Sequence, residues 1–345
     1  MLAWPHAQTD WAPRLAAIQT AFSQMIRTLA QEIPVVLLVP DHSMVKTLKK
    51  RFTAAPCPVY CQVAPYNDTW LRDSIFLSAV SDPRKETNTQ QPSWLALDFP
   101  FSGWGGKYNA HLDNQLNRYL LEKWRKLDHW QPRDFELEGG SVDFDGQGTV
   151  LTTSQCLQSR HPVPTPVLEE KLKQALNVHR VLWLTHGAIE GDDTDSHVDM
   201  LARFAGADRI VYQSCGERAD KHYEELQAMT DELHTFRQAN GQPYKLYPLP
   251  WPDAIYDSQS GRRLPASYAN FLISNKRVFV PVYDCPQDQQ ALAVMQDAFP
   301  THRIEAVPCR DLIWQNGSLH CSTMQLPLQA FTSIQPQLSD ENQIR

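Results

Sequence analysis

The sequence lacks the features that several large classes of protein require. Of its 345 residues, Lys and Arg supply 32 and Asp and Glu supply 39, which gives a formal charge of −7. Nucleic-acid-binding chains usually carry a basic excess, so we expect no nucleic-acid partner. The best apolar run, residues 35–39, is far shorter than the roughly 20 residues that cross a bilayer. The first six residues show neither a basic start nor an apolar signal core, so we expect a cytoplasmic protein.

Cysteine and glycine are also sparse. The seven cysteines include no CxxC pair, so we expect neither a disulfide framework nor a zinc site of four thiolates. A single thiol with a chemical role remains open. The 14 glycines stand beside 25 prolines, a balance typical of short elements separated by many turns.

Hydrophobic periodicity predicts helices and strands mixed along the whole chain. Residues 1–334 are expected to form one domain and residues 335–345 a polar tail. A polar loop is expected over 81–93. The predicted helices cover 13–31, 45–51, 110–130, 167–178, 216–240 and 286–299. The predicted strands cover 35–39, 56–63, 138–144, 149–153, 180–184, 271–273, 278–282 and the chain from Leu319 onward.

The segments richest in reactive side chains recur at similar intervals. They lie near Asp73, Glu138, His197, Asn270 and Cys321, with gaps of 65, 59, 73 and 51 residues. One fifth of the chain is 69 residues. Five α/β units that each direct one element toward a shared centre would produce this spacing.

Cys321 is a candidate nucleophile. Small residues precede it in Asn316-Gly-Ser-Leu-His-Cys321, which would allow a ligand to approach the thiol. A thiolate is the strongest side-chain nucleophile near neutral pH, although most buried cysteines are inert. The neighbouring His320 is a less suitable base, because adjacent side chains on a strand point to opposite faces. We therefore expect the base to come from another segment.

Four carboxylates lie within eight residues around His197. If the segment is extended, Asp195, His197 and Asp199 share one face; a helix would place His197 and Asp199 about 200° apart. The alternatives are a cation site and a polar loop with helix-capping Asp residues. One histidine is a thin supply for a dinuclear metal site.

Two further segments contain carboxylates among apolar or aromatic neighbours. Glu138 precedes two glycines, which would let a planar ligand reach the backbone, or it is a salt-bridged strand residue before a bulge. Asp73 and Trp70 together suit a flat cation, because one can form bidentate hydrogen bonds and the other offers an aromatic face. An ion pair between Arg72 and an aspartate is the structural alternative.

Taken together, these segments resemble the agmatine deiminase and bacterial-type peptidylarginine deiminase family of the guanidine-modifying penteins. The resemblance runs along nearly the whole chain and keeps the order of the family's motifs. The matching segments are Trp4-Pro-His6 with Asp10-Trp11, Asn67-Asp-Thr-Trp-Leu-Arg-Asp73, Phe101-Ser-Gly-Trp-Gly-Gly-Lys107, Leu137-Glu-Gly-Gly-Ser141, Gly148-Thr-Val-Leu-Thr-Thr153, Asp193-Thr-Asp-Ser-His-Val-Asp199, Ser267-Tyr-Ala-Asn-Phe271 and Leu319-His-Cys321.

The resemblance implies an α/β fold: a five-bladed, pseudo-symmetric propeller, called a pentein, in a single domain. It implies the catalytic residues Cys321, His197, Glu138, Asp199 and Asp73. The substrate-binding residues would be Asp73, Asp199, Trp70 and Trp104. It also implies that the enzyme needs no metal and no organic cofactor.

The implied activity is hydrolysis of a linear amidine by a catalytic cysteine, within polyamine metabolism. Agmatine would give N-carbamoylputrescine, a putrescine precursor, and ammonia through a covalent thiouronium. The partner is then a small guanidino cation, and a homodimer is compatible with the sequence. The alternatives are a peptidylarginine deiminase, a metal-dependent ureohydrolase that releases urea, and a pentein that binds without catalysis.

The sequence departs from the family pattern beside two of these groups. Gln315-Asn-Gly-Ser318 stands where agmatine deiminases often have Gly-Gly-Gly-Asn, and Ser196 stands where they have glycine. These departures leave the reaction type in place. They bear on the substrate's tail, as do the open roles of Arg72, Asp193 and Asp195.

Overall fold

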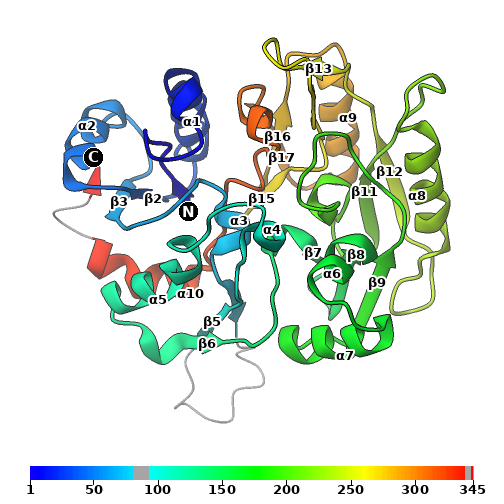
Figure 1. Ribbon diagram of the computed structural model, residues 1–345, viewed down its shortest axis with the longest axis horizontal. Helices are drawn as coiled ribbons and strands as arrows, with labels where there is room; N and C mark the ends of the chain where they lie inside the picture. The colour runs from blue at the N-terminus through cyan, green and yellow to red at the C-terminus, as the bar shows by residue number, and fades with distance from the viewer. Residues whose placement is uncertain (81–92, 339–342, 345) are drawn as a thin grey trace. The chain divides into compact units, whose positions relative to one another are not determined.

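The computed structural model describes residues 1–80, 93–338 and 343–344. They divide into two compact units, each described by itself here: Met1–Gly139 with Ser322–Arg345, and Gly140–Cys321 (Figure 1). The loop expected over 81–93 lies outside the described residues except for Ser93. Of the expected tail, residues 339–342 and 345 also lie outside them.

The first unit contains two sheets whose parallel strands are joined by helices. One sheet has the order β1-β2-β3-β18, and the other has the order β4-β5-β6. Parallel neighbours need a crossover connection; α2 crosses from β2 to β3, and α5 crosses from β5 to β6. The strands are β1 (Leu2–Ala3), β2 (Val35–Val39), β3 (Val59–Val63), β4 (Leu77–Val80), β5 (Trp94–Asp98), β6 (Trp130–Pro132) and β18 (Gln343–Ile344). The helices are α1 (Leu15–Leu29), α2 (His42–Arg51), α3 (Leu71–Ser74), α4 (Gly103–Gly106), α5 (Asp113–Lys123) and α10 (Leu328–Ile334), with short 3-10 turns at Ala12–Arg14, Leu127–His129 and Gln335–Leu338.

The second unit contains three sheets of the same design and one small hairpin. The sheets have the orders β7-β8-β9, β10-β11-β12 and β15-β16-β17, and each pairs its first two strands antiparallel and its last two parallel. β13 and β14 form the hairpin. The strands are β7 (Val142–Phe144), β8 (Thr149–Thr153), β9 (Arg180–Leu184), β10 (Ala202–Phe204), β11 (Arg209–Gln213), β12 (Lys245–Leu249), β13 (Ile255–Tyr256), β14 (Arg263–Leu264), β15 (Leu272–Ser274), β16 (Arg277–Val282) and β17 (Arg303–Pro308). The helices are α6 (Ser154–Arg160), α7 (Thr165–Leu176), α8 (Tyr223–Thr235) and α9 (Asp288–Ala298), with 3-10 turns at Val198–Met200 and Leu312–Gln315.

The expected mixture of helices and strands is confirmed, and its design repeats along the chain. Among the described residues, the sheet β4-β5-β6 of the first unit and the three larger sheets of the second share one pattern: an antiparallel pair followed by a helical crossover to a parallel strand. In each of these four repeats, a polar segment that the sequence singled out comes just before the first strand: Asp73 before β4, Glu138 before β7, Asp199 before β10 and Asn270 before β15. The architecture therefore supplies several equivalent strand ends from which functional loops can leave.

Burial explains why these elements form where the sequence predicts them. All five residues of β2 are buried, which fits a short apolar run between prolines. The predicted apolar stripe of α1 is the face that packs inward: Ile18, Phe22, Met25, Ile26 and Leu29 are buried. Each large apolar side chain removed from water contributes roughly 1.5–3 kcal/mol. None of the helices in the described part of the chain has both the length and the apolar composition needed to cross a membrane.

Four predicted elements differ clearly from the observed ones. The helix expected over 110–130 spans only Asp113–Lys123, and a 3-10 turn at Leu127–His129 and the start of β6 occupy the end of the predicted range. The strand expected over 138–144 begins only at Val142, because Gly139–Ser141 form a 3-10 turn. The helix expected over 216–240 begins at Tyr223, because Asp220 binds side chains from the loops that follow and holds 216–222 as a loop. Residues 319–322 form turns where the last predicted strand was expected to begin.

Candidate active site

Cys321 lies in a turn whose backbone is held by one asparagine side chain. Asn270 Oδ1 accepts hydrogen bonds from the backbone N–H groups of His320 and Cys321, at 2.8 and 3.3 Å. Asn270 Nδ2 donates to Cys321 Sγ at 3.1 Å and to the backbone carbonyl of Asp199 at 3.3 Å. Because the side-chain carbonyl of Asn270 takes N–H groups that a strand partner would otherwise take, this segment turns instead of extending. The thiol is 6% exposed and Asn270 is fully buried.

One carboxylate oxygen of Asp199 lies near both the thiol and an imidazole. His320 Nδ1 is 2.7 Å from Asp199 Oδ2, and Cys321 Sγ is 3.7 Å from the same oxygen. All three side chains are buried. The strand assumption that set His320 aside is wrong, since the segment forms turns. His320 is within hydrogen-bond distance of Asp199, and the same carboxylate oxygen lies near the thiol.

Asp192 shapes the loop that carries His197. Its Oδ1 accepts from the N–H and the hydroxyl of Thr194, at 3.0 and 2.6 Å, and its Oδ2 accepts from the N–H of Ser196 at 2.9 Å. Thr194 Oγ1 in turn accepts from the N–H of His197 at 3.1 Å. Burial raises the pKa of the Asp192 carboxyl, and the attraction of His197 opposes that rise. The polar-loop interpretation of this aspartate is therefore the one that the structure favours.

The extended conformation considered for residues 195–199 is not formed. Asp195 and Ser196 have φ angles of 65° and 68°, in the left-handed region, and a 3-10 turn follows over Val198–Met200. The hydrogen bonds that Asp192 accepts hold this stretch as a loop. The positions of His197 and Asp199 are therefore set by a turn and do not depend on a shared strand face.

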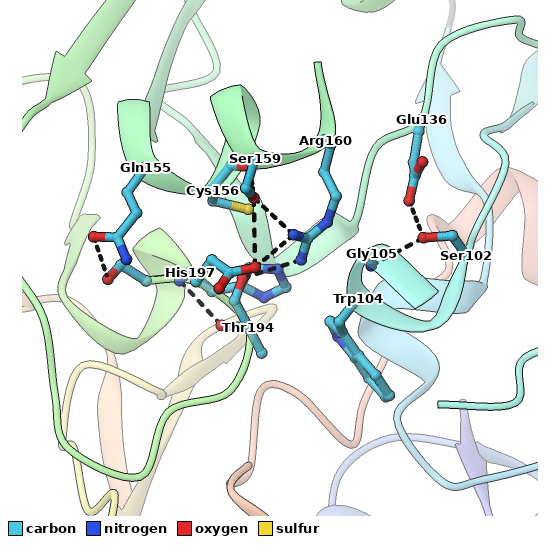
Figure 2. A network of polar contacts seen from close by, with 12 residues as sticks. Ser102, Trp104, Gly105, Glu136, Gln155, Cys156, Ser159, Arg160, Thr194 and His197 are labelled. Carbon is cyan, nitrogen blue, oxygen red and sulfur yellow. Dashed lines mark hydrogen bonds and ion pairs between the residues drawn. The ribbon is translucent and has the colours of Figure 1, made fainter. Parts of the chain in front are cut away.

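The remaining carboxylates of the cluster bind separate partners. Asp195 pairs with Arg160 of α6, with Asp195 Oδ2 at 2.6 Å from Arg160 Nη1, and Arg160 Nη2 also donates to the carbonyl of Thr194 (Figure 2). Asp193 accepts from Asn316 Nδ2 at 2.7 Å. Asp193 and Asp195, two of the four carboxylates considered for a cation site, thus have side-chain partners.

His197 is almost fully buried on the α6 side of its loop. Its side chain is 1% exposed, and a ring nitrogen lies within 4.8 Å of Cys156 Sγ. Figure 2 shows the ring beside Cys156, which comes from the first turn of α6. Thr153 Oγ1, at the N-cap of α6, donates to the carbonyl of Ser196 at 2.7 Å and ties this helix to the His197 loop. These contacts hold the backbone on both sides of the His197 Cα, and they place the ring next to α6.

Asp73 and Trp104 form a buried pair in the first unit. Asp73 lies in α3, and its Oδ2 accepts from Trp104 Nε1 at 3.0 Å. Trp104 has a φ of 57° between two glycines that also have positive φ, so the chain bends sharply here. Ser102 stabilises the bend by accepting from the N–H of Gly105 at 3.0 Å and donating to Glu136 (Figure 2). The indole N–H therefore orients the carboxylate that the sequence assigned to a cation.

The other predicted residues of the first unit are also buried. Trp70 packs against Trp11, with ring centroids 5.9 Å apart, and Glu138 is fully buried. A side chain on Gly139 would approach the backbone carbonyl oxygen of Arg72 to 2.1 Å, so this position needs glycine for close packing. Arg72 donates to Met324 Sδ at 3.3 Å and to the side chain of Gln325. The first glycine of the Glu-Gly-Gly segment thus serves chain packing, where we expected ligand access.

Sequence reasoning missed Asn270 and Arg160 as residues of this site. Asn270 was noted as the centre of one reactive segment and as part of a matching motif but was given no role, and Arg160 was not singled out. A usable signal was present in the first case, because an uncharged polar residue between Tyr268, Ala269 and Phe271 needs buried partners. Nothing in the local pattern around Arg160 marks it as the partner of Asp195.

Geometry of this kind, a buried thiol beside an amide donor and a carboxylate, is suited to nucleophilic chemistry on a cationic carbon. Residues 1–327 match the family model of the Porphyromonas-type peptidyl-arginine deiminases, and the chain belongs to this family. The chain is 29% identical to a Vibrio parahaemolyticus protein provisionally named agmatine deiminase, over 94% of this chain and 93% of that one.

Solved structures resemble the chain over nearly its full length. A cysteine-to-serine variant of C. jejuni agmatine deiminase with substrate bound is 35% identical, with a TM-score of 0.83, and the match covers 93% of this chain and 91% of that one. A Porphyromonas gingivalis protein provisionally named arginine deiminase is 41% identical, with a TM-score of 0.82 and 95% coverage of both chains. The fold and the family are thus shared with deiminases of guanidino compounds.

Proposed function

We propose that this protein is a cysteine-dependent hydrolase that converts agmatine and water to N-carbamoylputrescine and ammonia. The observation that carries the proposal is the position of the Cys321 thiol, 3.7 Å from the Asp199 carboxylate and 3.1 Å from the Asn270 amide. A guanidinium is planar and positive, so a carboxylate beside the nucleophile can bind its nitrogens and bring its central carbon to the sulfur. The substrate-bound cysteine-to-serine variant of the C. jejuni enzyme supports the same assignment.

The reaction divides into two steps at Cys321. The thiolate attacks the guanidinium carbon and forms a C–S bond; His197 donates a proton to the departing nitrogen, which leaves as ammonia, and a covalent thiouronium remains. A water molecule, deprotonated by His197, then attacks the same carbon. The C–S bond breaks, the thiolate is restored and a ureido product leaves. These steps use only protein side chains and water.

The roles of the other residues come from the motifs. Asp199 and Asp73 each bind guanidinium nitrogens, Glu138 orients His197, and Trp70 and Trp104 provide aromatic surface for the cation. Trp104 Nε1 already donates to Asp73, which supports a fixed orientation for that carboxylate. Substitution of Asp73 by Asn should therefore raise KM for a cationic substrate more than substitution of an exposed aspartate such as Asp128.

Finer features of the assembly belong to the same proposal. We infer that the sheets are blades of a five-bladed pentein propeller forming one catalytic domain over residues 1–334, followed by the tail 335–345. A cytoplasmic homodimer is the expected form of the protein. Light scattering of the purified protein tests the dimer, and cell fractionation tests the location.

Agmatine ranks above arginine compounds for an electrostatic reason. Free arginine carries an α-carboxylate, which a binding site usually holds with a second guanidinium. Arg72, the arginine among the matched motifs, is buried against Met324 and Gln325. Peptidylarginine is second because it lacks the free carboxylate, and the family description names that substrate. Free arginine is third.

A single product assay separates these alternatives. Agmatine, free arginine and an arginine-containing peptide are each incubated with the enzyme, with and without exhaustive chelation, and both ammonia and urea are measured. We expect ammonia from agmatine with the highest kcat/KM, unaffected by the chelator. Urea release lost on chelation and restored by manganese would indicate a ureohydrolase. A tenfold preference for arginine or the peptide, about 1.4 kcal/mol of transition-state discrimination, would overturn the ranking.

A further inference from the structure

Asn270 belongs to the matching segment Ser267-Tyr-Ala-Asn-Phe271, to which the resemblance assigns no role. We propose that Asn270 is a catalytic residue that donates a hydrogen bond to Cys321 Sγ and thereby favours the thiolate form of the nucleophile. This inference rests on the proposed function of Cys321. In this proposal the neutral side chain of Asn270 helps to activate the thiol.

The orientation of the Asn270 amide follows from its partners. Oδ1 lies 2.8 Å from the backbone nitrogen of His320 and 3.3 Å from that of Cys321, and both of these groups can only donate. The atom that faces them must therefore be the carbonyl oxygen, since an amide nitrogen there would meet two donors. The NH2 group consequently faces the sulfur.

The two hydrogens of this NH2 group have two acceptors within reach. The backbone carbonyl oxygen of Asp199 lies 3.3 Å away, and Cys321 Sγ lies 3.1 Å away. A thiolate is a much stronger acceptor than a thiol, and a hydrogen bond to the charged form of a group favours that form. Asn270 is fully buried, so water competes little for this donor.

The charged and titratable groups around the sulfur make such a donor useful. The Asp199 carboxylate, 3.7 Å from Sγ, disfavours a second negative charge, and His320 donates to that carboxylate when Nδ1 carries hydrogen. Tyr283 also faces this region: burial raises the pKa of its hydroxyl, and charge on Cys321 raises it further. Asn270 adds an attractive contact on the sulfur itself without adding charge.

The sharpest test replaces Asn270 with aspartate. Asn270→Asp keeps an oxygen for the N–H groups of His320 and Cys321 and removes the N–H donor at the sulfur. We expect iodoacetamide to alkylate Cys321 at least about tenfold more slowly at neutral pH, with the midpoint of the rate against pH shifted upward by about one unit or more. Peptide mass spectrometry reads the rate at Cys321 separately from the other six cysteines.

A second variant and a matched control separate this effect from lost stability. Asn270→Ala removes the donor without adding charge and should shift the midpoint in the same direction by a smaller amount. Asn117→Ala removes another buried asparagine, one that accepts from the N–H of Phe76 and donates to Asp98. It should lower stability and leave the alkylation profile of Cys321 unchanged. Unchanged profiles in folded Asn270 variants would overturn the proposal.

A measurement on the unsubstituted chain covers the case in which the variants do not fold. In protein labelled with ¹⁵N asparagine, the side-chain NH2 resonances of Asn270 should shift with the ionisation of Cys321 and respond to its alkylation. Side-chain NH2 resonances of Asn270 that change neither with the ionisation of Cys321 nor with its alkylation would contradict the hydrogen bond. Iodoacetamide needs no substrate, so these results are independent of whether the wild-type protein turns over agmatine.

Discussion

The shared oxygen of Asp199 is the most informative contact at the scale of single residues. The same Oδ2 meets the His320 imidazole and the Cys321 thiol, so the orientation of the proposed guanidinium-binding carboxylate depends on His320. Loss of a hydrogen-bond donor disfavours the ionised form of a buried carboxylate and weakens the control of its direction. We therefore infer that His320 is a positioning residue that acts through Asp199.

Substitution of His320 should therefore weaken the binding of a cationic substrate. We expect His320→Ala to lower kcat/KM for agmatine by about tenfold or more, mainly through KM, because a hydrogen bond to a charged group is worth about 1.5–3 kcal/mol. His320→Asn places an N–H donor near the position of Nδ1 and should restore part of the loss. Steady-state kinetics of the two variants check this.

The control for that prediction is His234→Ala, which removes an exposed histidine at the end of α8. It should leave both kinetic parameters unchanged. Equal losses in His320→Ala and His320→Asn, confined to kcat, would argue that His320 does not act by donating to Asp199.

Single residues also mark the limit of what the sequence could predict. Cys321, His197 and Asp199 were singled out as candidates from residue type and pattern, their roles were implied by the resemblance, and the structure places Asp199 3.7 Å from the Cys321 thiol. His320 was set aside because a strand was assumed, and Asn270 was left without a role. Both errors arise from one tertiary contact, the Asn270 side chain that turns residues 319–322, which no local pattern reveals.

At the scale of elements, the loops that carry His197 and Cys321 are joined through Asn316. Its Nδ2 donates to Asp193 at 2.7 Å, and its Oδ1 accepts from Arg262, which precedes β14. Arg262 also donates to the carbonyl of Trp314 at 2.7 Å. Asn316 has a φ of 72°, a conformation common for glycine, which is the residue that agmatine deiminases often have there. The departure at Gln315–Ser318 thus adds a side chain that links three segments.

Replacement of Asn316 by glycine should loosen these loops without straining the backbone. We expect Asn316→Gly to reduce kcat/KM for agmatine severalfold and to speed amide hydrogen exchange over residues 191–199, because the bonds to Asp193 and Arg262 are lost. Hydrogen exchange followed by mass spectrometry measures the loop directly. Gly261→Ala is an unsuitable control because of its positive φ, so Gln259→Ala in the same hairpin serves instead.

Exchange in Asn316→Gly that matches the wild type would show that the bridge does not hold the loop. Faster exchange with unchanged kinetics would show that the link to catalysis is wrong. Either result leaves the assignment of Cys321 untouched.

Elements with their own strong pattern were predicted well. β2, β8 and β9 have the predicted bounds, and α1 lies within its predicted range. Helix α8 was predicted too long because residues 216–222 are polar enough to continue its pattern. The side chain of Asp220 instead binds Arg263 and Trp251, contacts from distant segments that a local reading does not contain.

At the scale of the whole molecule, the main feature is the repeated sheet. The motifs of the family are far apart in the sequence, and several of them come just before the first strand of such a sheet. Four sheets share an antiparallel pair and a parallel third strand in the described part of the chain. The similar spacing of the reactive segments predicted five α/β units, and four sheets of the described chain share one pattern. The paired order of strands within each sheet could not be predicted, because it depends on contacts between segments separated by a helix.

The central claim is that Cys321 is the nucleophile of a hydrolytic deiminase. The most direct test measures ammonia release from agmatine by the wild type, by Cys321→Ala and by the control Cys61→Ala, whose thiol is buried in β3 with a pKa raised by burial to about 12. We predict full or nearly full activity in Cys61→Ala. Cys321→Ala should keep its fold and lose at least about three orders of magnitude in kcat, because removing the nucleophile leaves only binding and general acid–base groups. Substantial ammonia release by folded Cys321→Ala would contradict the account.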